Sequence, residues 1–519
     1  MSSHRARIMR TALESLRSDG CYLPLSDTAV DGKPSPRIFE IGLNRYPDVF
    51  DGCLPQICGD RKPTTYALFN LDHDAVTRRR SLPVPENVFP AWKTAVLRHG
   101  SGSHSTAAAL PFNPAGGHRH ADNLSLYYFD RGRAILGDQG YVGDTPMNEW
   151  IHSTFSHNLV IVDGEEQQRQ NREPSLGMMF TTPHVSVIEA YSGAYPGCTR
   201  YRRFLALLKG PEAQSILLDI FRVRGGKKHA WRIYSELAAS DAMESEMQFD
   251  GIELAGHEEL PEYGASVERD NIYGLQDVRG VDDAVAPFRT VWCDEHGRYR
   301  LHILSNADRV EISHGPGQEK LSQAGRRVRY LDVVRQGAQL DSTFVALHEP
   351  DGSGGSLPVE SVERLRVPEE AGADAVAVRL DTQWGSYVVL NEFRQECMVG
   401  GIRFEGHCGV VGETNGGKAW LASCGATTLE ADELGFSGTV PVWGREMQIK
   451  NRYEICPKTP RPEGWPELVL PGTWVLVGDG DVFTGLPVSQ CSKDSIRVRD
   501  FPLPDATEFR LPSTFYRKK

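Results

Sequence analysis

The protein has 519 residues, of which 40% are hydrophobic and 24% are charged, values typical of a globular protein and not of a disordered chain. Its formal net charge of −12 argues against general binding to nucleic acid, because such proteins neutralise phosphates with clustered Lys and Arg. The length predicts two or three domains, and the 51 glycines and 32 prolines favour short strands joined by turns over a helical fold.

Ten cysteines are scattered along the chain, and none forms a Cys-x-x-Cys pair. We therefore expect neither a thiolate zinc site nor a thioredoxin-type motif. No stretch of 18 apolar residues occurs, so no transmembrane helix is expected, and the first 20 residues lack the apolar centre of a signal peptide. Taken from Met1, the sequence gives no indication of an exported location.

Arginines gather in three short segments, at 78–80, 200–203 and 326–329. In a chain of net negative charge, an anionic ligand would need such a cluster to meet its charge locally. A solvated face is the commoner explanation of a charge run, and it stays open for each segment.

The N-terminal region predicts one amphipathic helix within its first 20 residues. Apolar side chains recur there three or four residues apart, at Ile8, Met9, Ala12, Leu13 and Leu16. Asp19-Gly20 predicts the end of this helix. The rest of the region, to about residue 90, has mixed character, so 1–90 is predicted to be a short helical part with a linker.

Short strands replace this pattern from about residue 93. Apolar or alternating runs that end in Gly or Asp turns recur in KTAVLRHG (93–100), NLSLYYFD (123–130), RAILGDQG (133–140) and HNLVIVDG (157–164). Gly225-Gly226 predicts a hairpin between the two strands beside it. We predict a mainly β fold, with a large antiparallel β-sandwich over 91–395 and a smaller C-terminal β domain over 396–519.

Two histidines, His118 and His120, stand one residue apart in GGHRHADNLSL (116–126). If the strand begins at or before residue 118, both imidazoles project from the same face. Such a pair suits two ligands of one centre. Two hydrogen-bonded surface imidazoles are an alternative explanation of the same pattern.

Two further polar residues lie at the ends of apolar strands. Asp138 follows a strand and precedes a Gly turn, and His157 begins a nearly all-apolar strand that should be buried. A buried polar group without a partner costs roughly 1–3 kcal/mol, so each needs one. Two histidines and one carboxylate would make a three-ligand site of the kind that Zn²⁺ takes, with a fourth position open.

Three segments in this order, GGHRHADNLSL (116–126), DRGRAILGDQGY (130–141) and HSTFSHNLVIVDGEEQ (152–167), resemble the C-terminal β-sandwich signature of the heparinase II/III family of polysaccharide lyases. The resemblance is strong over about residues 93 to 165 and looser in DIFRVRGGKKHAWRIY (219–234). The order and spacing of the segments make it much more specific than the histidine pair alone.

The resemblance implies a role for each matching residue. His120, Asp138 and His157 match zinc ligands, and the metal is expected to be mainly structural. His118 matches the histidine that borders the substrate cleft. Two more positions, Asp122 and Asn158, are expected to support the site through hydrogen bonds behind the ligands.

The lyases of this family also use residues of an N-terminal (α/α) toroid. A full toroid cannot fit into the 117 residues before His118. Three explanations are open: a truncated sequence, a toroid on a separate chain, or catalysis lost with the sandwich kept. Tyr141 is a local candidate for the catalytic tyrosine, and His152 could face the cleft; packing beside a turn and a surface role are their respective alternatives.

The predicted function is a polysaccharide lyase, or the sandwich part of one, that cleaves an acidic, uronic-acid-containing glycan by β-elimination. A non-catalytic, zinc-stabilised glycan-binding or structural sandwich is the alternative, and a hydrolase that uses a zinc-bound water ranks below both. The expected partner is an acidic polysaccharide or oligosaccharide, and a homodimer is left open. The resemblance implies a periplasmic or extracellular location if the start is truncated.

Overall fold

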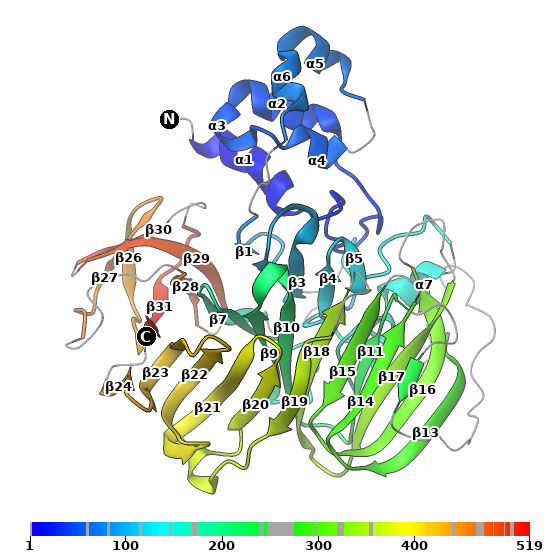
Figure 1. The fold of residues 1–519 in the computed structure, drawn as a ribbon, viewed down its shortest axis with the longest axis vertical. Helices are drawn as coiled ribbons and strands as arrows, with labels where there is room; N and C mark the ends of the chain where they lie inside the picture. The colour runs from blue at the N-terminus through cyan, green and yellow to red at the C-terminus, as the bar shows by residue number, and fades with distance from the viewer. Residues whose placement is uncertain are drawn as a thin grey trace.

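A computed structural model describes residues 3–58, 62–79, 84–113, 117–145, 147–168, 174–237, 243–245, 274–294, 297–318, 326–351, 357–438, 442–462, 472–480, 482–492, 494–498 and 503–519. Antiparallel sheets dominate these ranges, and helices gather at the N-terminal end, drawn in blue in Figure 1. The predicted mainly β, sandwich-type fold is confirmed. The predicted domain limits stay predictions.

The helices are short. They are α1 (Ser3–Glu14), α2 (Pro36–Arg45), α3 (Pro47–Phe50), α4 (Leu54–Cys58), α5 (Thr65–Asn70), α6 (His73–Thr77) and α7 (Met147–His152). The expectation of one N-terminal helix was wrong in number, because α3 to α6, with four to six residues each, are too short to show a clear period. Within the described ranges, none of the helices has the length and apolar character needed to cross a bilayer.

The N-terminal helices form a small core of their own. Phe39 and Phe50 are fully buried there, with ring centroids 6.2 Å apart, and Leu16 joins them. Isolated helices of this length are marginal in water, so this packing stabilises them.

Among the described residues, the strands form five sheets. The first has the order β1 (Asn87–Phe89), β2 (Thr94–His99), β3 (Thr106–Pro111), β4 (Tyr127–Asp130), β5 (Arg133–Leu136). The second, with eight strands, has the order β12 (Met243–Ser245), β14 (Phe288–Cys293), β15 (Arg298–Ile303), β18 (Asp341–Asp351), β10 (Ser215–Arg224), β9 (Arg200–Lys209), β8 (Val185–Tyr191), β7 (Ser175–Thr181). The third has the order β13 (Gln276–Ala284), β16 (Ala307–Gly317), β17 (Arg326–Gln336), β11 (Lys228–Tyr234), β6 (Val160–Val162).

The remaining two sheets lie later in the chain. The fourth has the order β19 (Val359–Arg364), β20 (Val376–Thr382), β21 (Gly385–Val399), β22 (Ile402–Thr414), β23 (Ala419–Ala431), β24 (Leu434–Phe436), and β32 (Thr514–Lys518) also pairs with β23. The fifth has the order β25 (Val442–Trp443), β31 (Glu508–Pro512), β28 (Trp474–Asp479), β29 (Val482–Cys491), β30 (Ile496–Val498), β27 (Glu454–Pro457), β26 (Met447–Asn451).

The eight-stranded sheet is a central layer with a core on each face. Along β9, Leu205 and Leu207 belong to the core shared with the third sheet, whereas Phe204 and Ala206 belong to the core shared with the fourth. This follows from the period of two in a strand, which sends successive side chains to opposite faces. Both faces of β9 are therefore apolar, and the strand reads as a continuous apolar run.

The turn at Gly225-Gly226 connects two sheets. The predicted hairpin was wrong: β10 pairs with β9 and β18, whereas β11 pairs with β17 and β6. Gly225 has a φ of 114°, and a Cβ there would lie 2.3 Å from the carbonyl oxygen of Gly197. Glycine is thus required by the close backbone approach where the chain changes layer.

Candidate functional site

The two histidines of the motif lie on a turn between β3 and β4, and not on a strand. The strand does not begin at or before residue 118, so the condition for both imidazoles to project from one strand face is not met. The His118 side chain is 94% exposed, whereas that of His120 is fully buried. The two imidazoles consequently have different surroundings and different chemistry.

His120 lies in a buried cluster with Asp138, which follows β5, and His157, which precedes β6. His120 Nδ1 is 3.3 Å from His157 Nε2 and 3.4 Å from Asp138 Oδ1. His157 Nε2 is 4.0 Å from Asp138 Oδ2. The structure thus brings together the three residues that the sequence grouped as ligands.

Hydrogen bonds outside the cluster fix which ring nitrogens face inward. His157 Nδ1 lies 2.8 Å from the carbonyl oxygen of Ser153, which can only accept, so Nδ1 carries the proton and Nε2 presents a lone pair. Asp138 Oδ2 is buried and has no hydrogen-bond partner within the described part of the chain. A buried carboxylate oxygen without a hydrogen-bond partner destabilises the folded protein, and a bound cation would supply the missing partner.

The spacing of the three residues also suits a small cation. Ligand atoms about 2.0–2.1 Å from a tetrahedral Zn²⁺ lie about 3.3 Å from one another. The measured separations of 3.3, 3.4 and 4.0 Å lie close to that value. His120, Asp138 and His157 could therefore hold a zinc ion with little movement.

The pKa values of the cluster in the absence of a metal also indicate a place for a cation. Burial lowers the pKa of His120, but Asp138 and Asp27 outweigh it and raise this pKa to about 10. Burial lowers the pKa of His157 to about 4. Burial also opposes the ionisation of Asp138, but His120 outweighs it and lowers that pKa. A proton on His120 thus occupies the place that a bound cation would take.

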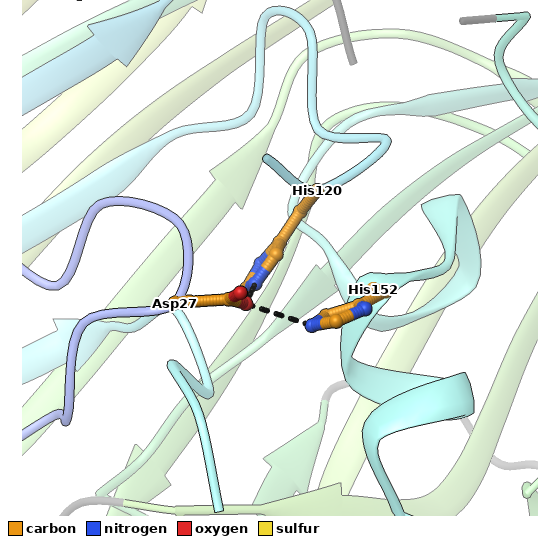
Figure 2. Close-up of side chains that lie close together, drawn as sticks. All are labelled: Asp27, His120 and His152. Atoms are coloured by element: carbon orange, nitrogen blue, oxygen red, sulfur yellow. Dashed lines mark hydrogen bonds and ion pairs between the residues drawn. The ribbon is translucent and has the colours of Figure 1, made fainter. Parts of the chain in front are cut away.

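Asp27, in the segment between α1 and α2, is the residue that the sequence did not reveal. Figure 2 shows His120 and His152 directed at its carboxylate, with His152 Nε2 2.8 Å from Oδ1. His120 Nε2 lies 3.4 Å from the same oxygen, and His118 Nδ1 lies 2.7 Å from Oδ2. Burial opposes its ionisation, but hydrogen bonds from His120 and His118 lower the pKa of Asp27 to about 2.

An ionised Asp27 can only accept hydrogen bonds, so His118 Nδ1 and His120 Nε2 are donors. The other nitrogen of each ring then carries a lone pair when the ring is neutral. For His120 this is Nδ1, which faces Asp138 and His157. A carboxylate behind a histidine ligand is the usual device for orienting the ring toward a metal.

Asp27, His120 and His152 also form a second group with metal-ligating atoms close together. Both oxygens of Asp27 already accept hydrogen bonds from histidines, whereas Asp138 Oδ2 has no such partner among the described residues. The cluster of His120, Asp138 and His157 is therefore the better candidate for a metal.

The two predicted supporting residues lie beside this cluster. Asp122 is buried, its Oδ2 accepts a hydrogen bond from the Tyr127 hydroxyl at 2.5 Å, and burial raises its pKa to about 6. Asn158 Oδ1 accepts from the Tyr234 backbone amide at 2.8 Å, and its Nδ2 donates to the carbonyl of Gly137 at 3.4 Å. Asn158 thus ties β11 to the residue before Asp138.

A cleft of about 650 Å³ opens beside the cluster, between the N-terminal segment and the first sheet. We call it the histidine cleft; its lining includes Tyr22, Ser26, Trp92, Asn113, His118 and Arg119. The sequence did not single out Tyr22, because it lies in a loop without periodic pattern. Burial raises the pKa of Tyr22 and keeps it a neutral phenol.

Tyr141, the predicted tyrosine, has a different setting. Its hydroxyl donates to Asp144 Oδ1 at 2.6 Å, three residues further along the same loop. Of the described tyrosines, Tyr22 and not Tyr141 is among the residues lining the histidine cleft. A catalytic role for Tyr141 stays a prediction.

The fold and the site define a β-sandwich protein with a buried histidine and aspartate cluster beside a cleft. Residues 82–251 match the family model described as heparinase II/III-like, C-terminal. This range contains all the residues of the cluster. The resemblance noted in the sequence is confirmed.

A protein with the name of a lyase is also similar to part of this chain. The chain is 23% identical over 312 residues to a protein named alginate lyase from Stenotrophomonas maltophilia (strain K279a), and the match covers 53% of this chain and 39% of that protein. The chain thus spans well under two thirds of that relative.

Solved structures show the same fold. A heparan sulfate lyase HepC mutant from Pedobacter heparinus matches with a TM-score of 0.50 and 13% identity, over 74% of this chain and 52% of that one. A structure of heparinase III matches with a TM-score of 0.51 and 11% identity, over 74% and 54%. At such identities the likeness establishes the fold alone.

Proposed function

We propose that the protein is a polysaccharide lyase, or the sandwich-bearing part of one, that cleaves an acidic, uronic-acid-containing glycan by β-elimination in the histidine cleft. The observation that carries the proposal is the pairing of His118 with Asp27 at the wall of that cleft. The matched family model and the lyase relative support the same reaction class. The family resemblance supports a periplasmic or extracellular location if the start of the sequence is truncated.

His118 is the proposed base. Because Asp27 accepts the proton on Nδ1, the lone pair of Nε2 is available to take the proton from C5 of the uronic acid. The electrons of that C–H bond form the C4–C5 double bond, and the bond from C4 to the bridging oxygen breaks. Asp27 is a positioning residue that holds the imidazole in this tautomer.

Tyr22 is the proposed proton donor to the leaving oxygen. Its raised pKa keeps the phenol protonated until negative charge develops nearby. Arg119 and Asn113 also line the cleft and are the proposed donors to the uronate carboxylate. Such donors stabilise the charge that builds on the carboxylate as the C5 proton leaves.

His120, Asp138 and His157 are the proposed ligands of a Zn²⁺ ion with a mainly structural role. A bound cation would neutralise the buried Asp138 and fix the turn that carries His118. The protein residues, and not the metal, then perform the proton transfers.

The test uses the purified full chain with alginate, heparan, hyaluronan and pectate-type polymers. We expect an ultraviolet absorbance from the unsaturated product with one of these polymers. His118→Ala should lower the rate by about 10²–10⁴-fold, the usual contribution of a general base. His73→Ala, at an exposed histidine of α6, is the matched control and should leave the rate unchanged.

Two results would contradict the proposal. Silence on every polymer would favour a non-catalytic glycan-binding sandwich. New reducing ends without the double bond would indicate a hydrolase.

A further inference from the structure

A second cleft, of about 690 Å³, lies away from the histidine cleft, where three sheets meet. Strands β7 to β9 of the central sheet, β21 and β22 of the fourth sheet and β28 and β31 of the fifth contribute to its walls, and the three groups lie next to one another in Figure 1. We call it the arginine cleft; its lining includes Glu189, Tyr191, Arg202, Glu392, Arg394 and His407.

The floor of the arginine cleft holds buried charges that the protein does not fully satisfy. Glu189 and Arg202 have relative exposures of 1% and 6%. Glu189 Oε1 and Arg202 Nε and Nη2 are buried without a hydrogen-bond partner among the described residues. The nearest charged partners of Arg202 are 3.4–3.6 Å away, at Glu392, Asp374 and Glu189.

This arrangement is unusual for a purely structural ion cluster. Structural clusters of buried charges persist when each donor and acceptor is paired, because an unpaired one costs roughly 1–3 kcal/mol or more. Here both a carboxylate oxygen and two guanidinium nitrogens remain open beside a cavity. Both a donor and an acceptor beside the cavity therefore lack a hydrogen-bond partner among the described residues.

The rim of the cleft is positive. Of the described residues, five arginines and three carboxylates line the cavity, and Asp341, outside this lining, pairs with Arg200 and Arg224. One positive charge is left in excess. Arg394 and Arg224 are 68% and 44% exposed, and the guanidinium of Arg510 lies 4.0 Å from the centre of the Phe483 ring. His407 adds to this charge, because its hydrogen bond to Glu392 raises its pKa.

In two of the three arginine segments, arginines contact carboxylates of the protein and do not simply form a solvated charge run on the surface. In the segment 200–203, Arg202 and Arg203 are buried. Arg203 is paired with Asp219, whereas Arg202 has the open donors described above. In the segment 326–329, Arg326 Nη2 contacts Glu236.

We propose that the arginine cleft binds a uronic-acid unit of an acidic oligosaccharide, a site separate from the histidine cleft. Arg394, at the rim, takes the sugar carboxylate, because a guanidinium pairs with a carboxylate through strong, charge-assisted hydrogen bonds. Glu189 and Glu392 accept hydrogen bonds from the sugar hydroxyls, and Tyr191 borders the ring. The choice of a sugar follows from these donors and acceptors; only the statement that the sugar belongs to the cleaved glycan rests on the proposed function.

Calorimetric titration of the full chain with sodium glucuronate tests the site, with glucose and inorganic sulfate as the comparison ligands. We expect glucuronate to bind at least about tenfold more tightly than either, since each contact with a charged group contributes on the order of 1.4 kcal/mol. Arg394→Ala should weaken glucuronate binding by about tenfold. Because Arg394 is largely exposed, this variant should keep the wild-type melting temperature.

A matched control tests whether the loss is specific to the arginine cleft. Arg497→Ala removes an arginine of similar exposure, 57% against 68% for Arg394, outside this cleft and should bind glucuronate as the wild type does. Tyr191→Phe should weaken binding by a smaller factor.

Three outcomes would overturn the proposal: no binding of glucuronate, equal binding by Arg394→Ala, or competition by sulfate as strong as that of glucuronate. The ultraviolet lyase assay on the same samples separates the two proposals. Loss of glucuronate affinity in Arg394→Ala alone establishes the arginine cleft even if no polymer is cleaved.

Discussion

Asp27 Oδ2 lies 2.7 Å from His118 Nδ1, although 91 residues separate the two in the chain. The pair joins the segment between α1 and α2 to the turn that carries the histidine motif. On the other side of the same carboxylate lies His120, a member of the buried cluster. One aspartate therefore positions both the exposed histidine and the buried one.

Asp27→Ala should lower kcat by about 10²-fold and change KM little, because it removes the group that orients the His118 ring without touching the cleft residues that bind the sugar. Steady-state kinetics on the cleaved polymer measure this. Asp31→Ala, at an exposed aspartate of the same segment, is the control and should behave as the wild type. An equal loss in both variants would mean that the segment as a whole, and not the carboxylate, matters.

His157→Ala should remove about one zinc ion per chain in elemental analysis, because His157 Nε2 is one of three converging ligand atoms. The exposed His73 provides the matched variant, and His73→Ala should keep its metal. Equal zinc in the wild type and in His157→Ala would refute the ligand assignment.

His120→Ala and His118→Ala should separate stability from catalysis. Loss of the buried His120 removes a proposed metal ligand and leaves Asp27 and Asp138 without their shared partner. We therefore expect a loss of roughly 2 kcal/mol or more in the free energy of unfolding. His118 is 94% exposed, and its removal should leave the melting temperature nearly unchanged. If both variants melt alike, this division of roles is wrong.

Asp219→Asn should destabilise the central sheet. Arg203 lies 3.0 and 2.5 Å from the two carboxylate oxygens of Asp219, and it also donates to the carbonyl oxygens of Leu124 and Asn158. Removing the negative charge leaves a buried cation unpaired, at a cost of about 3–5 kcal/mol. Asp308→Asn, at the exposed partner of Arg335, should cost less than about 1 kcal/mol in the same denaturant unfolding experiment.

The same pair makes stability depend on pH. Burial opposes the ionisation of Asp219, but Arg203 and the hydrogen bond from His348 lower its pKa. The contribution is therefore complete above the unfolded pKa of about 3.9 and is lost as the pH falls through the folded value. Wild type should lose more stability than Asp219→Asn on acidification below about pH 4; parallel losses would contradict this.

The sequence predicted the sheet fold from its short apolar runs, and the resemblance to the heparinase II/III family implied the grouping of His120, Asp138 and His157. The role of Asp27 left no signal of either kind, since it lies in a loop and meets its histidines only through the tertiary fold. The sequence also did not predict that the chain passes from the second sheet to the third at Gly225-Gly226, for a related reason. A glycine pair fits both a tight hairpin and a close approach to a distant backbone, here at Gly197.

The orientation of His118 in the cleft depends on the position of the N-terminal segment, because Asp27 of that segment contacts the histidine turn. His120, Asp138 and His157 all come from the sandwich side, although Asp27 also contacts His120. The partner of His118 lies 91 residues upstream, in the N-terminal segment. We therefore expect detachment of this segment to abolish the proposed catalysis before it releases the proposed zinc ion, because all three proposed ligands remain on the sandwich.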